Sequence, residues 1–196
     1  MAHYYDEQPS GPLMQSDVLV RLFGKEYRFT TASGLFSKGH VDVATRLLIE
    51  RCVLDNAHEV LDLGCGWGVV GIMLKLRHSE LEVTCSDINS RALAMTKKNA
   101  RRLDASVAVV QSDIFKDIDK TFDTILTNPP YVAGRAVCFR FIEQSHDHLR
   151  RGGTLQLVAR HNKGGKVLSQ KMEDVFGNVE PVAISSGFRI YLSKKT

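Results

Sequence analysis

The stretch Leu61-Asp62-Leu63-Gly64-Cys65-Gly66-Trp67-Gly68 decides the fold of this chain. It continues an apolar segment that we expect to be a strand at 58–63, and a segment with the pattern of a helix follows at 69–77. Its three glycines fall where the backbone must turn sharply and let a ligand come close. The stretch therefore predicts a strand, a binding loop and a helix in succession.

Outward from this unit, strand and helix patterns continue to alternate along the chain. Such alternation implies a parallel sheet with helices on both faces. The pattern predicts strands at 58–63, 81–86, 106–111, 122–128, 154–160, 178–184 and 188–193, and helices at 69–77, 90–102, 136–150 and 165–176. Only Ser186 and Gly187 separate the last two strands. Because a parallel crossover needs about a dozen residues, these two strands are expected to pair antiparallel.

The expected fold class is therefore α/β, with a seven-stranded, mostly parallel, doubly wound sheet of Rossmann-like type. The residues before the alternating region add a small element to it. Residues 1–16 are polar and are expected to form a flexible leader. Two alternating segments, 17–23 and 26–31, flank Gly24 and Lys25 and predict a β-hairpin. Residues 40–51 have the apolar spacing of an amphipathic helix. We expect one domain over residues 17–196.

Composition limits the classes of protein that remain possible. The chain has 196 residues and is 43% hydrophobic, which suits one well-packed core. Its apolar runs are strand-sized and no apolar signal core opens it, so we expect no membrane span and a cytoplasmic location. The net charge of +4 is compatible with an anionic partner without requiring one. The scattered cysteines argue against zinc or a disulfide framework: Cys52, Cys65, Cys85 and Cys138.

Acidic residues end three successive strands and suit the parts of S-adenosylmethionine (SAM). Asp62 stands just before the segment Gly64–Gly68, the glycine loop, where a carboxylate suits a cationic ammonium and sulfonium. Asp87, followed by Ile88, ends the second strand and can accept hydrogen bonds from two ribose hydroxyls. Asp113 ends the third strand and can accept one from an adenine amino group, with Ile114 supplying a backbone N–H and an apolar face. Alone, Asp113 is more typical of a turn residue.

A dinucleotide cofactor is the alternative interpretation of the same region. Residues 66–71 also spell G-x-G-x-x-G, and Asp87 follows the first glycine by about 20 residues, as in a nicotinamide-binding fingerprint. However, the carboxylate of Asp62 would repel two phosphates. Asp87 can in addition belong to the cap of the next helix, together with Asn89. We favour SAM, with contacts from Asp62, Gly64, Cys65, Gly66, Gly68, Asp87, Ile88, Asp113, Ile114 and Asn128.

The tetrapeptide Asn128-Pro129-Pro130-Tyr131 follows the fourth strand and predicts the catalytic turn. The oxygen of the Asn128 side chain and the carbonyl of Pro129 can hold the two N–H bonds of a planar amine and draw its nitrogen toward a nucleophilic form. Pro130 stiffens the turn and removes a competing donor. Tyr131 can stack on a base. A stiff turn without chemistry is the simpler alternative.

From residue 17 onward the sequence resembles the small-domain methyltransferases, which include bacterial small-subunit ribosomal RNA guanine-N2 methyltransferases and single-domain archaeal relatives. The resemblance rests on Thr30–Ser37 with Asp42, Val60–Ile72, Asp87-Ile88-Asn89, Thr127–Pro130, Phe176–Glu180 and Gly187-Phe188-Arg189. It implies a class I methyltransferase fold, SAM as the cofactor and RNA as the substrate, with no metal. Tyr131 departs from the family's usual residue after the two prolines.

The resemblance and the turn together predict a SAM-dependent RNA methyltransferase acting on a guanine nitrogen of ribosomal or transfer RNA. N2 is favoured and N7 is possible. The residues expected to contact RNA are Phe36, Tyr131, Arg135, Arg160 and Lys163. Two alternatives stay open: a protein glutamine-N5 methyltransferase, whose side-chain amide presents the same planar NH₂, and an RNA-binding module with a vestigial SAM site. The oligomeric state cannot be read from the sequence, and a monomer is compatible with it.

Overall fold

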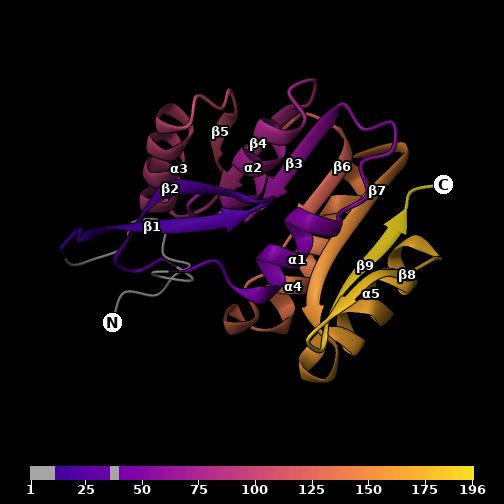
Figure 1. Ribbon diagram of the computed structural model, residues 1–196. Coiled ribbons are helices and arrows are strands. Elements are labelled where there is room, and N and C mark those ends of the chain that lie inside the picture. Colours follow the sequence, from indigo (N-terminus) through magenta and orange to yellow (C-terminus); the bar gives the residue numbers. More distant parts are fainter. Residues whose placement is uncertain (1–11, 36–39) are drawn as a thin grey trace.

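The computed structural model describes residues 12–35 and 40–196, and a seven-stranded sheet runs through it (Figure 1). The spatial order of the strands is β5-β4-β3-β6-β7-β9-β8. All neighbours pair parallel except β9, which runs antiparallel to both β7 and β8. The strands are β3 (Glu59–Leu63), β4 (Glu82–Asp87), β5 (Ala108–Gln111), β6 (Phe122–Thr127), β7 (Leu149–Arg160), β8 (Glu180–Ser185) and β9 (Phe188–Lys194). The expected fold, including the antiparallel end, is confirmed.

Helices cover both faces of this sheet and enclose two hydrophobic cores. They are α1 (Val43–Arg51), α2 (Val69–Arg77), α3 (Ser90–Arg102), α4 (Arg135–His148) and α5 (Lys166–Phe176). Neighbouring residues of a strand point to opposite faces. Accordingly, Val60 packs with residues of α1, α2 and α3, whereas Leu61 and Leu63 pack with residues of α4 and α5. Because helices cover both faces, successive residues of the central strands β3, β4 and β6 are buried on either side.

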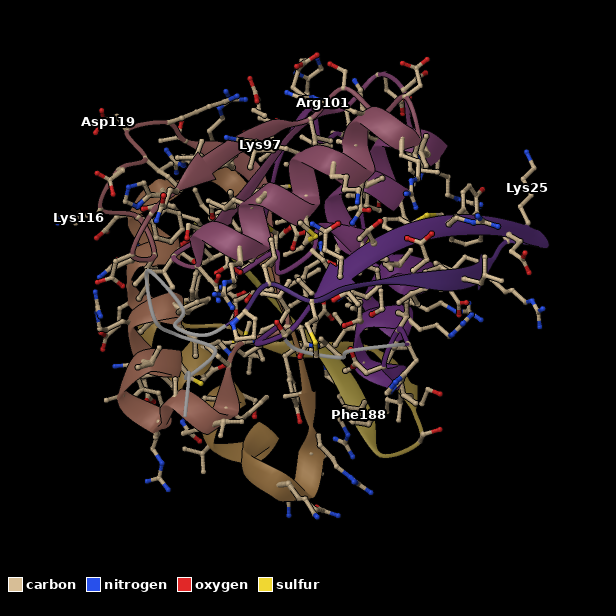
Figure 2. All side chains as sticks on the ribbon, turned by 90° about the vertical axis from the view of Figure 1, so that its left-hand side faces the viewer. Lys25, Lys97, Arg101, Lys116, Asp119 and Phe188 are labelled. Atoms are coloured by element: carbon tan, nitrogen blue, oxygen red, sulfur yellow. The ribbon has the colours of Figure 1, made fainter. Side chains whose placement is uncertain are left out.

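A two-stranded hairpin, β1 (Gln15–Leu22) and β2 (Lys25–Ala32), packs on α3. Figure 2 shows Lys25 at the tip of the hairpin, and Lys97 and Arg101, both exposed, on α3 away from that tip. Asn99 of α3 ties the hairpin to the glycine loop, because its side-chain amide bonds both backbone groups of Thr30 and the carbonyl of Trp67. The hairpin therefore supports the loop from outside the main sheet.

Among the boundaries that differ from the sequence expectations are the starts of β1 and β7. β1 begins at Gln15, inside the segment expected as a leader, and residues 1–11 lie outside the described part. β7 begins at Leu149, where the sequence predicted the end of a helix, and α4 ends at His148. Leu149 is buried and pairs with Phe122 across a shift of register. Gly153 then fits tightly, since a Cβ there would lie 2.9 Å from the Asp123 carbonyl oxygen.

Within residues 12–35 and 40–196, no helix is both long and apolar enough to cross a membrane. The same residues hold no group of three or more His, Cys, Asp or Glu side chains placed to bind a metal ion. The four cysteines are free thiols, three of them buried.

Candidate active site

The ends of β3, β4, β5 and β6 surround a cavity of about 350 Å³ at the carboxyl edge of the sheet. This is the edge at which open α/β sheets bind their ligands. Its lining includes Gly64, Asp87, Ile88, Asp113, Ile114 and Asn128. The sequence therefore predicted half of the residues that the fold brings to this cavity.

A smaller hollow of about 40 Å³ adjoins the cavity and shares Gly64 and Asn128 with it. Its other walls come from the glycine loop, from Asp62 and from the first turn of α1, where Asp42 and Thr45 lie. The two spaces form one elongated site with Asn128 at the junction. Such a shape suits a cofactor with a large aromatic end and a small polar end.

The packing around the glycine loop leaves no room for a side chain at Gly68. Gly68 has φ 83° and precedes α2, and a Cβ there would lie 2.6 Å from Cγ2 of Thr96. Thr96 in turn donates a hydrogen bond of 2.9 Å to the carbonyl of Gly66. Gly64, with φ 75°, faces the ring of Phe141. Cys65 is buried beneath the loop, and its backbone N–H donates to the Ser86 carbonyl at 2.9 Å.

Asp87 holds the loop against the next strand. Its Oδ2 accepts a hydrogen bond of 2.9 Å from the backbone N–H of Gly66, and its Oδ1 accepts one of 2.9 Å from Asn89. Asn89, and not Asp87, caps α3. Burial raises the pKa of Asp87 to about 6, while the hydrogen bonds from Asn89, Gly66 and Ile88 oppose the rise. Each carboxylate oxygen can accept a further bond, so Asp87 keeps the capacity to bind ribose hydroxyls.

Asp62 is the second buried acid of the site. Its Oδ2 accepts a hydrogen bond of 2.9 Å from the backbone N–H of Gly71, which anchors the first turn of α2. Burial raises its pKa to about 7, the Gly71 hydrogen bond opposes this rise, and the negative charge of Asp87 adds to it. Asp87 lines the cavity and Asp62 lines the adjoining hollow, and burial disfavours the charged form of both carboxyls. A cationic ligand is therefore favoured there.

Asp113 and Ile114 form the wall at the end of β5. Asp113 is half-buried, and its Oδ2 accepts a hydrogen bond of 3.1 Å from Arg140 of α4. Ile114 is buried with φ 59°, a left-handed conformation that a β-branched residue rarely adopts. Strain of this kind gathers at functional sites. The strain and the cavity position agree with the expected adenine contact.

Asn128 follows β6 and is held from the side of α1. Its Nδ2 donates a hydrogen bond of 3.0 Å to Oγ1 of Thr45. The next carbonyl, that of Pro129, accepts a hydrogen bond of 2.9 Å from the Tyr131 N–H, and Pro130 lines the cavity. A carbonyl oxygen has a second lone pair, so Pro129 can accept one more hydrogen bond. Its role as an acceptor for the target amine stays a prediction.

Tyr131 begins a 3₁₀ turn, η1 (Tyr131–Ala133), and its half-buried ring packs against the core cluster to which α4 and α5 contribute. A Cβ on Gly164 would lie 3.4 Å from the ring, so the turn after β7 packs against the turn after β6. Its hydroxyl is buried and has no hydrogen-bond partner among residues 12–35 and 40–196, and burial raises the pKa of Tyr131 above its ordinary value. This position favours an anchoring role, and stacking on a base stays a prediction.

The other residues expected at the substrate lie around the rim or outside the described part. Arg135 is exposed at the start of α4, and Arg160 and Lys163 are exposed where β7 enters the turn η2 (His161–Gly165). The Arg160 guanidinium lies 5.7 Å from the centre of the Phe188 ring. Phe36 lies outside the described residues.

Sequence reasoning missed Thr45, Arg140 and Phe141, which also line the site. The two α4 residues carried a usable signal. Together with Val137 they are spaced by three and four residues directly after the catalytic turn, which puts them on one face of a helix. Thr45 carried none, because its partner Asn128 is 83 residues away.

Comparison with known proteins places this arrangement in a family. The family described as "Methyltransferase small domain" matches residues 26–192. The chain belongs to this family. The uncharacterized protein YbxB of Bacillus subtilis is 36% identical over 197 residues, covering 98% of each chain.

Two other proteins that this chain resembles are longer than it is. The ribosomal RNA small subunit methyltransferase C of Mannheimia succiniciproducens is 35% identical over 163 residues, covering 81% of this chain and 48% of that protein. The solved structure of the T. thermophilus 16S rRNA N2 methyltransferase RsmC, in complex with AdoMet and guanosine, superposes with a TM-score of 0.81 at 26% identity. It covers 96% of this chain and 52% of that one. The chain thus spans about half the length of these methyltransferases.

Proposed function

We propose that this protein is a SAM-dependent methyltransferase that modifies a guanine nitrogen of ribosomal RNA, with N2 as the favoured atom. The observation that carries the proposal is the position of Asn128. It directly follows β6, begins the tetrapeptide Asn-Pro-Pro-Tyr, and lines both the larger cavity and the smaller hollow. An acceptor oxygen at that junction would lie where cofactor and target base meet.

The cavity residues suit SAM in charge and in shape. The larger cavity offers Asp113 and Ile114 for an adenine ring and the buried Asp87 for the ribose. The smaller hollow, with Asp62 and the start of α2, suits the methionine part. A helix N-terminus there attracts a carboxylate, and a buried acid attracts an ammonium. AdoMet, another name for SAM, is the ligand of the RsmC structure that resembles this chain.

The chain's own residues would act by positioning and electrostatics. When bound, SAM supplies a methyl group on a positively charged sulfur. The Oδ1 of Asn128 would accept a hydrogen bond from one N–H of the guanine amine, and the Pro129 carbonyl would accept one from the other N–H. Both contacts draw the nitrogen out of conjugation with the ring, so that its lone pair faces the methyl carbon. The proton that the methylated nitrogen sheds passes to water, and no strong base is needed.

Affinity for RNA would come from cations at the rim. Arg135 at the start of α4, Arg160 at the end of β7 and Lys163 in η2 are exposed at the same edge of the sheet as the cavity. Contacts from such residues to phosphate give affinity without sequence choice. A guanine held in a helix must leave its stack to reach Asn128.

The proposal is tested by offering the purified protein methyl-labelled SAM and two acceptors, unmodified small-subunit ribosomal RNA and a release-factor protein. Label in RNA, lost in Asn128→Ala while SAM still binds, is the expected result. Label in the protein alone would identify a glutamine methyltransferase. Binding of RNA without binding of SAM would identify a vestigial cofactor site.

A further inference from the structure

A chain of hydrogen bonds connects the N-terminus of α1 to the proposed catalytic turn. The Oγ1 of Thr45 donates to Oδ2 of Asp42 at 2.5 Å, and the same oxygen accepts from Nδ2 of Asn128 at 3.0 Å. Asp42 also caps α1, since its Oδ1 accepts hydrogen bonds from the backbone N–H groups of Ala44 and Thr45. All three side chains line the smaller hollow.

The chemistry of the three groups gives this chain one direction. An ionised carboxylate only accepts hydrogen bonds, so the single hydroxyl proton of Thr45 must point to Asp42. The hydroxyl then has only lone pairs left for Asn128, and an amide can meet them only with its NH₂ group. The Oδ1 of Asn128 is thereby turned away from Thr45.

We propose that Asp42 and Thr45 are positioning residues that set the orientation of the Asn128 side-chain amide for methyl transfer. The inference rests on the proposed function of Asn128 as the acceptor for the target amine. With the amide fixed, Oδ1 meets the N–H of the target. With the amide reversed, two donors would face each other and the base would lose its main contact.

Thr45 is the better residue for a test than Asp42. It is 7% exposed, and valine has nearly the same shape without the hydroxyl. Thr45→Val removes the acceptor for Asn128 and leaves Asp42 able to cap α1. Thr45→Ser restores the hydroxyl. Thr124→Val is a matched control. Thr124 lies on β6, the strand that precedes Asn128, and its Oγ1 is hydrogen-bonded to Oγ1 of Thr154 at 3.3 Å.

The first readout needs no RNA. In ¹⁵N-labelled protein the side-chain amide signals of Asn128 are assigned by their loss in Asn128→Ala. We expect at least one of these protons to exchange slowly with water in the wild type and in Thr45→Ser. In Thr45→Val, exchange should be faster by roughly tenfold or more. Equal exchange in the wild type and Thr45→Val would overturn the positioning role.

The second readout is turnover. We expect kcat to fall roughly 10- to 100-fold in Thr45→Val, with the dissociation constant for SAM within about twofold of wild type. Thr45→Ser should recover most of the loss, and Thr124→Val should show none. In the Asn128→Ala background, Thr45→Val should have no further effect. A weaker SAM affinity with unchanged kcat would make Thr45 a cofactor contact and overturn the inference.

The two readouts separate this inference from the proposed function. If the wild type fails to methylate RNA while its Asn128 amide protons depend on Thr45, the proposed substrate is wrong and the hydrogen-bond chain stands. If the wild type methylates RNA and Thr45→Val does so equally well, the positioning role is wrong and the function stands.

Discussion

Binding of SAM should release about one proton from the protein at pH 6.5. Burial raises the pKa of Asp62 to about 7 and that of Asp87 to about 6, so both acids hold protons in the absence of the cofactor. SAM brings a sulfonium and an ammonium into the same space. A nearby positive charge favours the ionised form of a carboxyl and lowers its pKa.

The magnitude follows from the two pKa values. At pH 6.5, roughly three quarters of the Asp62 side chains and a quarter of the Asp87 side chains are protonated, about one proton per molecule. If the bound cofactor returns both values to near the ordinary 3.8, nearly all of that proton is released. At pH 8.5 both groups are already ionised, and the release should fall to roughly a tenth or less.

Calorimetry in buffers of different ionisation enthalpy measures the released protons directly. The amino group of SAM titrates in a similar range, so the comparison is with Asp62→Asn, in which the cofactor's share is unchanged. We expect the variant to release roughly three quarters of a proton less at pH 6.5. An equal release by both proteins would refute the placement of the cationic groups near Asp62.

The same shifts predict how stability depends on pH. Both acids have folded-state pKa values above the unfolded value of 3.8, so they bind protons more tightly when folded. Their stabilising contribution is complete below that value and is lost as pH rises through 6 and 7. The Tm of the cofactor-free protein should therefore be higher at pH 5 than at pH 8. This difference in Tm should be larger for the wild type than for Asp62→Asn. An identical dependence in the two proteins would contradict this account.

Substitutions at four positions test other parts of the structure. Asn128→Ala should lower kcat by roughly 100-fold or more and leave SAM binding nearly intact, and near-normal turnover would remove Asn128 from catalysis. Gly71→Ala places a Cβ 2.4 Å from Sγ of Cys85, so it should lower the free energy of unfolding by about 1–3 kcal/mol in urea, less so when combined with Cys85→Ala. Additive effects would show that the two residues do not clash. Arg160→Ala and Lys163→Ala should each weaken RNA binding and reduce its salt dependence by about one unit of slope. An unchanged slope would exclude phosphate contacts.

The fold could be predicted because strand and helix patterns alternate clearly and the inner strands β3, β4 and β6 are buried on both faces. β7 is the exception. Its first residues, Leu149 to Gly153, contain two glycines and two arginines, which no strand pattern includes. Their strand structure depends on pairing with β6, and Gly153 is needed because the backbone of β6 lies too close for a side chain.

Within the site, residues at strand ends could be predicted, whereas the helix residues carried at most the spacing of Val137, Arg140 and Phe141 along α4. Asp87 and Asn128 follow strands whose carboxyl ends must meet, so topology alone brings them together. The contributions of Thr45 and Arg140 depend on how α1 and α4 are rotated against the sheet. For Tyr131 the motif predicts a base contact, which stays a prediction, while the structure adds that its half-buried ring packs against the core beside Gly164.

The most direct test of the central claim is the identity of the methylated nucleoside. Small-subunit ribosomal RNA from a strain that lacks the gene is incubated with the protein and methyl-labelled SAM, digested, and analysed by mass spectrometry. Labelled N2-methylguanosine, absent with Asn128→Ala, is the result that this account predicts. Labelled 7-methylguanosine would contradict the role given to Asn128, because N7 of guanine carries no N–H bonds for it to hold.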